Sequence, residues 1–132
     1  MTHRPMSQPE VNRFFDDLHT WALERSVPAS TTAYGQHPDQ VVDLYGAEGR
    51  DGTLVLVLHG GFWRAGFTRR NTVALAVGLA EAGWAAANVE YRRLGPGEYR
   101  PLLDDVRRAR ERVGSFERIV AVGHSAGAQL AL

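Results

Sequence analysis

Short apolar runs alternate along this chain with longer segments in which apolar residues recur every three or four positions. The runs at 53–58, 84–91 and 119–122 are apolar on both faces, which is typical of strands covered by helices on both sides. The segments at 68–82 and 102–113, which lie between these runs, have the helical period. The pattern therefore predicts alternating strands and helices from about residue 53 onward.

An amphipathic helix is predicted near the amino terminus, over residues 8–25. Its apolar positions are Val11, Phe14, Phe15, Leu18 and Ala22. Ser7 and Glu10 stand three apart, as in a capping box, and Pro28 ends the helical region. Thr68 is the expected cap of the next helix, while Gly83 and Gly114 are expected just past two helix ends.

Residues 26–39 are rich in Ser, Thr, Pro and Gly, which predicts a loop or an irregular edge strand. Residues 40–45 alternate enough to form a strand, and the glycine-rich segment 46–52 is a turn with Asp51-Gly52 as its strongest signal. We expect the strands at 40–45 and 53–58 to pair as a hairpin across this turn.

The order of elements predicts an α/β fold, in which a doubly wound and mostly parallel sheet carries helices on both faces. No linker divides the chain, so we expect one partial domain over residues 1–132. Residues 1–30 would form the amino-terminal helix and lead-in. Residues 31–132 would form the sheet core up to the glycine-rich turn at 123–127.

Composition narrows the class of partner. The formal net charge is zero, from 15 basic residues, all arginine, and 15 acidic residues, so nothing favours nucleic acid. Cysteine is absent, which excludes disulfides and thiolate metal sites within these residues.

The longest apolar run, residues 54–58, is too short to span a membrane, and the first residues lack an apolar leader segment. A cytoplasmic location is expected.

The strongest chemical motif is Gly123-His124-Ser125-Ala126-Gly127, which lies between an apolar strand and the start of a helical pattern. That setting is the one in which a nucleophilic serine occupies a tight strand-to-helix turn. Gly123 and Gly127 would leave room for the turn, and Ser125 is the candidate nucleophile. His124 points elsewhere in such a turn and is interpreted as structural.

A second motif, His59-Gly60-Gly61-Phe62-Trp63, directly follows the first buried strand. Acyl transfer needs backbone donors at the oxygen that becomes negatively charged. The candidate oxyanion donors are the N–H groups of Gly61, Phe62 and Ala126. His59 and Gly60 are interpreted as structural support. Trp63 and Phe67 are candidates for a substrate pocket, with a role as ordinary core or rim residues equally open.

Together these motifs resemble α/β-hydrolase esterases with an HGG-type oxyanion loop, in the hormone-sensitive-lipase-like, acetyl-esterase and kynurenine-formamidase-like branch. The segments that carry the resemblance are HGGFWR at 59–64, GWAAANVEYRR at 83–93, YRPLLDDV at 99–106 and VGHSAGAQLAL at 122–132. Tyr34-Gly35 and residues 43–45 also suit this branch, so the resemblance covers about residues 34–132.

The chain departs from the family pattern in several places. Position 128 is Ala where a second glycine is usual, and the expected aromatic-Pro pair is displaced to Tyr99-Arg100-Pro101. In the family, the triad acid and histidine follow the serine, but no Asp, Glu or His follows Ser125 here. We therefore expect the chain to be the amino-terminal part of a hydrolase about twice as long, and inactive by itself.

The resemblance implies a serine hydrolase that acts on small carboxylic esters through an acyl-enzyme on Ser125, with no cofactor and no metal. An arylformamidase or amidase is the alternative within enzymes, and the ending of HGGFW favours the formamidase-like side. A ligand-binding module without catalysis, or an inactive fragment, is the alternative of another class. The expected partner is a small ester or amide, and the sequence leaves the oligomeric state open.

Overall fold

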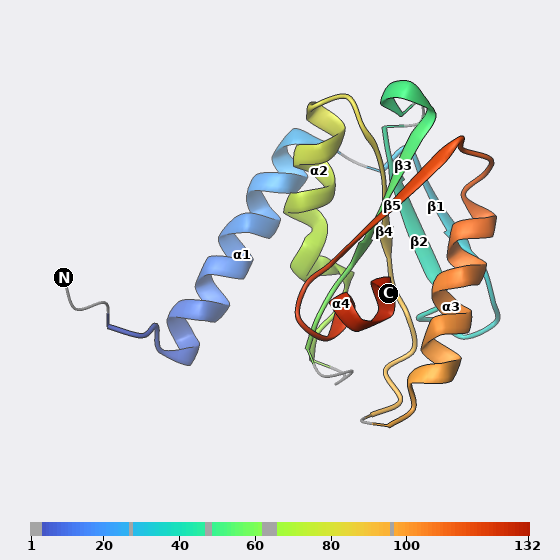
Figure 1. Ribbon diagram of the computed structural model, residues 1–132. Coiled ribbons are helices and arrows are strands. Elements are labelled where there is room, and N and C mark those ends of the chain that lie inside the picture. Colours follow the sequence, from blue (N-terminus) through green and yellow to red (C-terminus); the bar gives the residue numbers. More distant parts are fainter. Residues whose placement is uncertain (1–3, 27, 47–48, 62–65, 96) are drawn as a thin grey trace.

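Five strands form one mixed sheet with helices on both of its faces (Figure 1). The computed structural model describes residues 4–26, 28–46, 49–61, 66–95 and 97–132. The strands are β1 (Ser30–Ala33), β2 (Val41–Tyr45), β3 (Thr53–Leu58), β4 (Ala85–Val89) and β5 (Arg118–Gly123). The helices are α1 (Gln8–Arg25), α2 (Val73–Glu81), α3 (Tyr99–Arg112) and α4 (Ala126–Ala131), with short 3₁₀ turns η1 (Arg50–Gly52) and η2 (Arg69–Thr72).

The strand order is β1-β2-β4-β3-β5, and the α/β class predicted from the sequence is confirmed. β3 pairs in parallel with both β4 and β5, whereas β2 pairs antiparallel with β1 and β4. The predicted hairpin of the strands at 40–45 and 53–58 is therefore wrong. β4 lies between these strands, because the crossover through α2 returns the chain to the side of β3 that faces β2.

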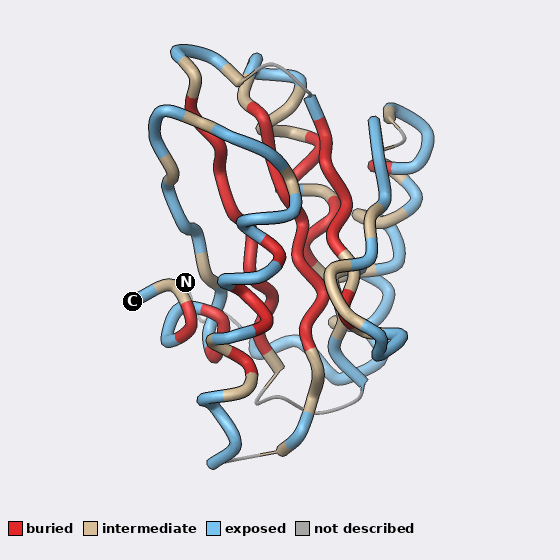
Figure 2. The backbone as a smooth tube through the Cα atoms, turned by 90° about the vertical axis from the view of Figure 1, so that its right-hand side faces the viewer, coloured by how far each residue is buried: buried red, intermediate tan, exposed pale blue. Residues whose placement is uncertain are grey.

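Alternate residues of the central strands face two separate apolar cores. On one side, Leu54, Leu56 and Leu58 of β3 pack with residues of α3 and α4. On the other side, Val55 and Val57 pack with residues of α1 and α2. Figure 2 shows the central strands as buried along their length. A strand apolar on both faces thus has a helical layer on each side, as the sequence pattern predicts.

The strand at 119–122, which the pattern predicts to be buried, is instead largely exposed. The side chains of Val120 and Val122 remain 43% and 38% exposed. β5 is an edge strand that pairs only with β3 among the described strands. Val120 and Val122 lie on the same face as Val55 and Val57, but neither belongs to the apolar core that α1 and α2 form on that face. Leu130 of α4 is buried as expected, but Leu132, which follows α4, is exposed.

The predicted helix boundaries are confirmed. α1 starts with the Ser7 and Glu10 capping box, in which the Ser7 N–H donates to the Glu10 carboxylate at 2.7 Å. Thr68 accepts a hydrogen bond from the Arg70 N–H and caps η2, which leads into α2. Gly83 and Gly114 adopt φ of +93° and +115° just past α2 and α3, in the region that favours glycine. No helix in the described part of the chain is long and apolar enough to cross a membrane.

Candidate active site

Ser125 occupies the turn between β5 and α4 with φ of +53° and ψ of −119°. A positive φ is rare for a residue with a side chain, and such strain persists only where the surrounding structure enforces it. The hydrogen bond from the His124 N–H to the Leu58 carbonyl, at 3.0 Å, fastens this turn to the end of β3. The turn therefore holds an exposed serine in a conformation that an ordinary loop would not maintain.

Three glycines let the serine turn pack directly against the end of β3. A Cβ on Gly60 would lie 2.9 Å from the Ser125 Cβ. A Cβ on Gly127 would overlap the Leu58 and His59 carbonyls, and one on Gly123 would overlap the α4 backbone. The two sequence motifs, more than sixty positions apart in the chain, are thus in backbone contact, and side chains at these positions would separate them.

Gly61 and Ala126 are the candidate oxyanion donors within the described residues. Gly61 has φ of +114°, and its N–H and that of Ala126 donate to no described residue. Phe62 and Trp63, the other candidates in this loop, lie outside the described residues. Phe67 packs against Gly61 where a Cβ would otherwise stand, and its side chain is 41% exposed. Two N–H groups without a partner among the described residues are thus available at the serine turn.

His59 is wholly buried at the base of the glycine loop. Its Nδ1 donates to the Gly60 carbonyl at 2.8 Å, and its Nε2 lies 2.8 Å from Oε1 of Glu90. The ring stacks on that of Tyr91 with the centroids 4.2 Å apart, and the Tyr91 hydroxyl donates to the His59 carbonyl at 2.5 Å. Both ring nitrogens are occupied, so the imidazole has no free nitrogen to accept a proton from Ser125.

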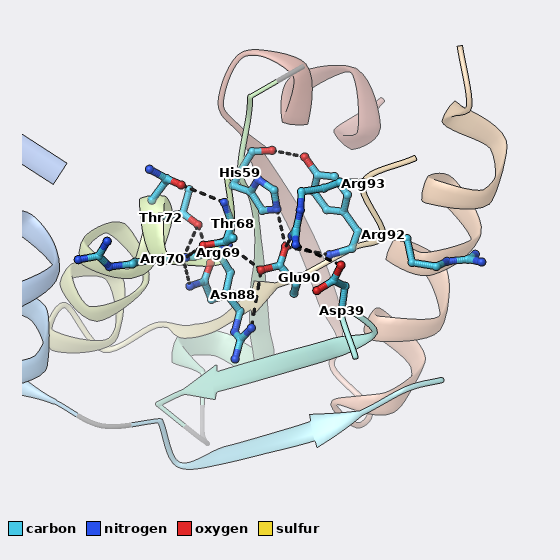
Figure 3. A network of polar contacts seen from close by, with 12 residues as sticks. Asp39, His59, Thr68, Arg69, Arg70, Thr72, Asn88, Glu90, Arg92 and Arg93 are labelled. Atoms are coloured by element: carbon cyan, nitrogen blue, oxygen red, sulfur yellow. Dashed lines mark hydrogen bonds and ion pairs between the residues drawn. The ribbon is translucent and has the colours of Figure 1, made fainter. Parts of the chain in front are cut away.

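Glu90, directly after β4, is the centre of the polar network in Figure 3. Besides His59, its Oε1 accepts a hydrogen bond from Nη1 of Arg93 at 2.7 Å, and its Oε2 accepts one from the Arg69 N–H at 3.0 Å. Arg69 and Arg93 in turn bind the carboxylates of Asp43 and Asp39. The network joins the carboxyl end of β4 to the glycine loop and to the start of α2.

The charge of Glu90 is maintained by its partners. Burial acts to raise the pKa of this carboxyl, but the hydrogen bond and charge of His59, the Arg69 N–H and the Arg93 guanidinium together hold the pKa below its ordinary value. Burial, with a smaller contribution from the Glu90 charge, raises the pKa of Tyr91. The Tyr91 hydroxyl therefore stays protonated and remains a donor to His59.

A second buried carboxylate, Asp105 of α3, lies outside this network. It accepts hydrogen bonds from the Gln40 amide at 2.9 Å, and from the backbone and guanidinium of Arg92 at 2.9–3.2 Å. These contacts tie α3 to the segment after β4.

The candidate site residues predicted from the sequence do not include Glu90, Tyr91, Arg69 or Arg93. A usable signal was present, because charged residues follow the apolar strand 85–89 without any intervening turn. Such residues lie at the carboxyl edge of the sheet, where the glycine loop also begins. Their partners, however, are distant in the chain.

A cleft of about 500 Å³ opens beside Glu90, toward α1. Its lining includes His19, Asp43, Arg69, Arg70 and Arg93, but neither Ser125 nor Phe67. The pocket expected around Phe67 is therefore not this cleft. No hydrogen bond joins the Ser125 hydroxyl to a described histidine, so no general base is in place for this serine among the described residues.

Comparison with known proteins places this geometry in a family. Residues 42–132 match the family model described as BD-FAE. The chain belongs to the BD-FAE family. The match includes the glycine loop, Glu90 and the serine turn. No curated protein sequence matches the chain.

Solved α/β-hydrolases share the fold of this BD-FAE domain. A candidate thioesterase from Silicibacter sp. TM1040 is 29% identical with a TM-score of 0.66, over 92% of this chain and 46% of its own. Esterase B from Lactobacillus rhamnosis, captured with a phosphonate inhibitor, is 25% identical with a TM-score of 0.64, over 93% and 45%. A bacterial hormone-sensitive-lipase family esterase, 19% identical with a TM-score of 0.57 over 98% and 45%, shares the fold. The chain spans about half the length of these structures.

Proposed function

We propose that Ser125 is the nucleophile of a carboxylic ester hydrolase. The observation that carries the proposal is the strained backbone of Ser125, packed against Gly60 at the end of β3. The N–H groups of Gly61 and Ala126 lie beside it and donate to no residue that the structure describes. This arrangement suits attack on a carbonyl carbon whose oxygen then gains negative charge. The esterases among the similar structures support the same class of reaction.

In the proposed reaction, the Ser125 hydroxyl attacks the ester carbonyl carbon and gives its proton to a histidine. The N–H groups of Gly61, Phe62 and Ala126 hold the oxyanion. The alcohol leaves with that proton, and water then releases the acid from the acyl-enzyme. Because both nitrogens of His59 are occupied, we propose that the histidine and its acid partner come from beyond residue 132.

The proposed substrates are small uncharged esters, with N-formyl aryl amides as the alternative that the HGGFW segment suggests. Both reactions would use the same nucleophile and the same oxyanion donors. Turnover of short-chain nitrophenyl esters and of N-formyl aryl amides by the complete enzyme, compared as kcat/KM, distinguishes them. Binding of both without turnover would instead favour a non-catalytic module.

Ser125→Ala in the complete enzyme tests the nucleophile. We expect the variant to lose labelling by a fluorophosphonate probe and to lose ester hydrolysis by about 10⁴-fold or more, because the attacking oxygen is gone. Ser115→Ala is the matched control, since Ser115 is an exposed serine in the loop before β5. Labelling that persists in Ser125→Ala, or is lost equally in Ser115→Ala, would contradict the proposal.

A further inference from the structure

One buried carboxylate binds both ends of the glycine loop. Oε1 of Glu90 contacts the His59 ring at 2.8 Å, where the loop leaves β3. Oε2 accepts a hydrogen bond from the Arg69 N–H at 3.0 Å, where the loop enters η2 (Figure 3). We infer that Glu90 is a positioning residue that sets where the oxyanion donor of Gly61 lies relative to Ser125. This inference rests on the proposed function of the loop.

The carboxylate is suited to this bridge. It has two oxygens that only accept hydrogen bonds, and both ends of the loop present donors to it. Arg93 contacts the same Oε1 at 2.7 Å and offsets the negative charge, so that Glu90 remains ionised at 2% exposure. An amide in this position would turn an NH₂ group toward a donor in either orientation.

Tyr91 holds the first end of the loop at two further points. Its hydroxyl donates to the His59 carbonyl and its ring stacks on the imidazole. The peptide unit between His59 and Gly60 is thus held from the Tyr91 side, while the ring is held by Glu90. The two consecutive residues that directly follow β4 therefore supply the contacts that fix the start of the loop.

The contacts that fix His59 lie close to the groups proposed to act in catalysis. Gly61 stands two positions after His59, and Gly60 is packed against the Ser125 Cβ. A shift of His59 would therefore move the Gly61 N–H relative to the serine. Donors to a developing oxyanion act only in the transition state, and a displacement of about 1 Å at such a site can cost about 100-fold in rate.

A role in folding alone would give a different result from a role in positioning. The matched comparison is Asp105, which is also buried, also ionically paired and also bound to a segment that follows β4. Asp105 has no hydrogen bond to a described residue of the glycine loop. A purely structural carboxylate at either position should affect the melting temperature without acting selectively on kcat.

The experiment compares Glu90→Gln with Asp105→Asn in the complete enzyme. For Glu90→Gln we expect kcat and kcat/KM toward a nitrophenyl ester to fall together by about 10- to 100-fold with KM nearly constant, the signature of an interaction lost only in the transition state. Asp105→Asn should lower the melting temperature and leave kcat near the wild-type value. Tyr91→Phe, which removes only the hydroxyl, should lower kcat in the same direction by less, and it decides the question if Glu90→Gln does not fold.

Hydrogen exchange separates this inference from the proposed function. The backbone amide of Arg69, which donates to Glu90, should exchange faster in Glu90→Gln than in the wild type. Its exchange rate should be unchanged in Asp105→Asn. An inactive wild-type enzyme would refute the proposed function while the exchange result still decides the bridge. A folded Glu90→Gln with wild-type kcat, or with a loss of kcat that Asp105→Asn reproduces, would overturn the positioning role, and an unchanged Arg69 amide would overturn the bridge itself.

Discussion

Glu90 keeps its negative charge although it is almost wholly buried, and this has a consequence for acid stability. Its pKa in the folded protein lies below the ordinary value of 4.5, because the favourable contacts of His59, Arg69 and Arg93 outweigh the opposing effect of burial. A group of this kind stabilises the folded state fully above its ordinary pKa. The contribution is lost as the pH falls through the lowered value.

The free energy of unfolding of the wild type should therefore exceed that of Glu90→Gln by a constant amount at neutral pH. That difference should shrink once the pH falls below about 4.5 and through the lowered pKa, since the neutral carboxyl loses the same ionic contacts that Gln lacks. Urea unfolding of both proteins at several pH values measures it. A difference that grows toward acid pH would show that the carboxyl is protonated in the folded state.

The glycines of the site and the carboxylate beside them differ in how far a sequence reveals them. Gly60, Gly123 and Gly127 lie in two short motifs that are recognisable from adjacent residues, although Gly60 and Gly127 pack against atoms more than sixty positions away. Glu90 acts on residues 31 and 21 positions away, so only its place after an apolar strand hints at a role. The proposed nucleophile was thus predictable, and its supporting network was not.

At the scale of elements, hydrophobic period identified the strands and helices but not all of the strand pairing. The period records which faces of an element are buried, while pairing depends on how crossovers pack. β2 has the alternation of a hairpin partner for β3, yet its neighbours are β1 and β4. β5 likewise has the composition of a buried strand although Val120 and Val122 are exposed, since the composition of a strand does not indicate whether a covering helix extends over it.

Ala128 tests how tightly the start of α4 is packed. The family pattern has glycine there, but the Ala128 side chain is exposed, whereas a Cβ at Gly127 would overlap two carbonyl oxygens of the β3 end. Ala128→Gly should lower the free energy of unfolding by about 0.5–1 kcal/mol through helix propensity, with probe labelling of Ser125 unchanged.

Gly127→Ala is the matched variant, and it should abolish labelling because the turn must move away from β3. Both effects are measured by urea unfolding and by fluorophosphonate labelling rates. Faster labelling of Ala128→Gly would mean that the alanine methyl does crowd the turn.

At the scale of the whole molecule, the described residues supply one half of the chemistry proposed for the site. The proposed nucleophile and two of the proposed oxyanion donors meet at the end of β3, and the network around Glu90 binds the loop that carries one of these donors. No described histidine forms a hydrogen bond with the Ser125 hydroxyl, so none of them is placed as its base. The similar structures are about twice as long as this chain.

These 132 residues, expressed alone, should therefore neither react with a fluorophosphonate probe nor hydrolyse nitrophenyl esters, whereas the complete enzyme should do both. Without a base the Ser125 hydroxyl stays protonated and is a weak nucleophile at neutral pH. Exposed Val120 and Val122 on the edge strand β5 should also make the short chain self-associate, which size-exclusion chromatography detects. The decisive comparison is labelling of the soluble short chain against its Ser125→Ala variant. Labelling that depends on Ser125 would mean that these residues contain their own base. His124, the exposed histidine beside the serine, would then be the candidate for that base.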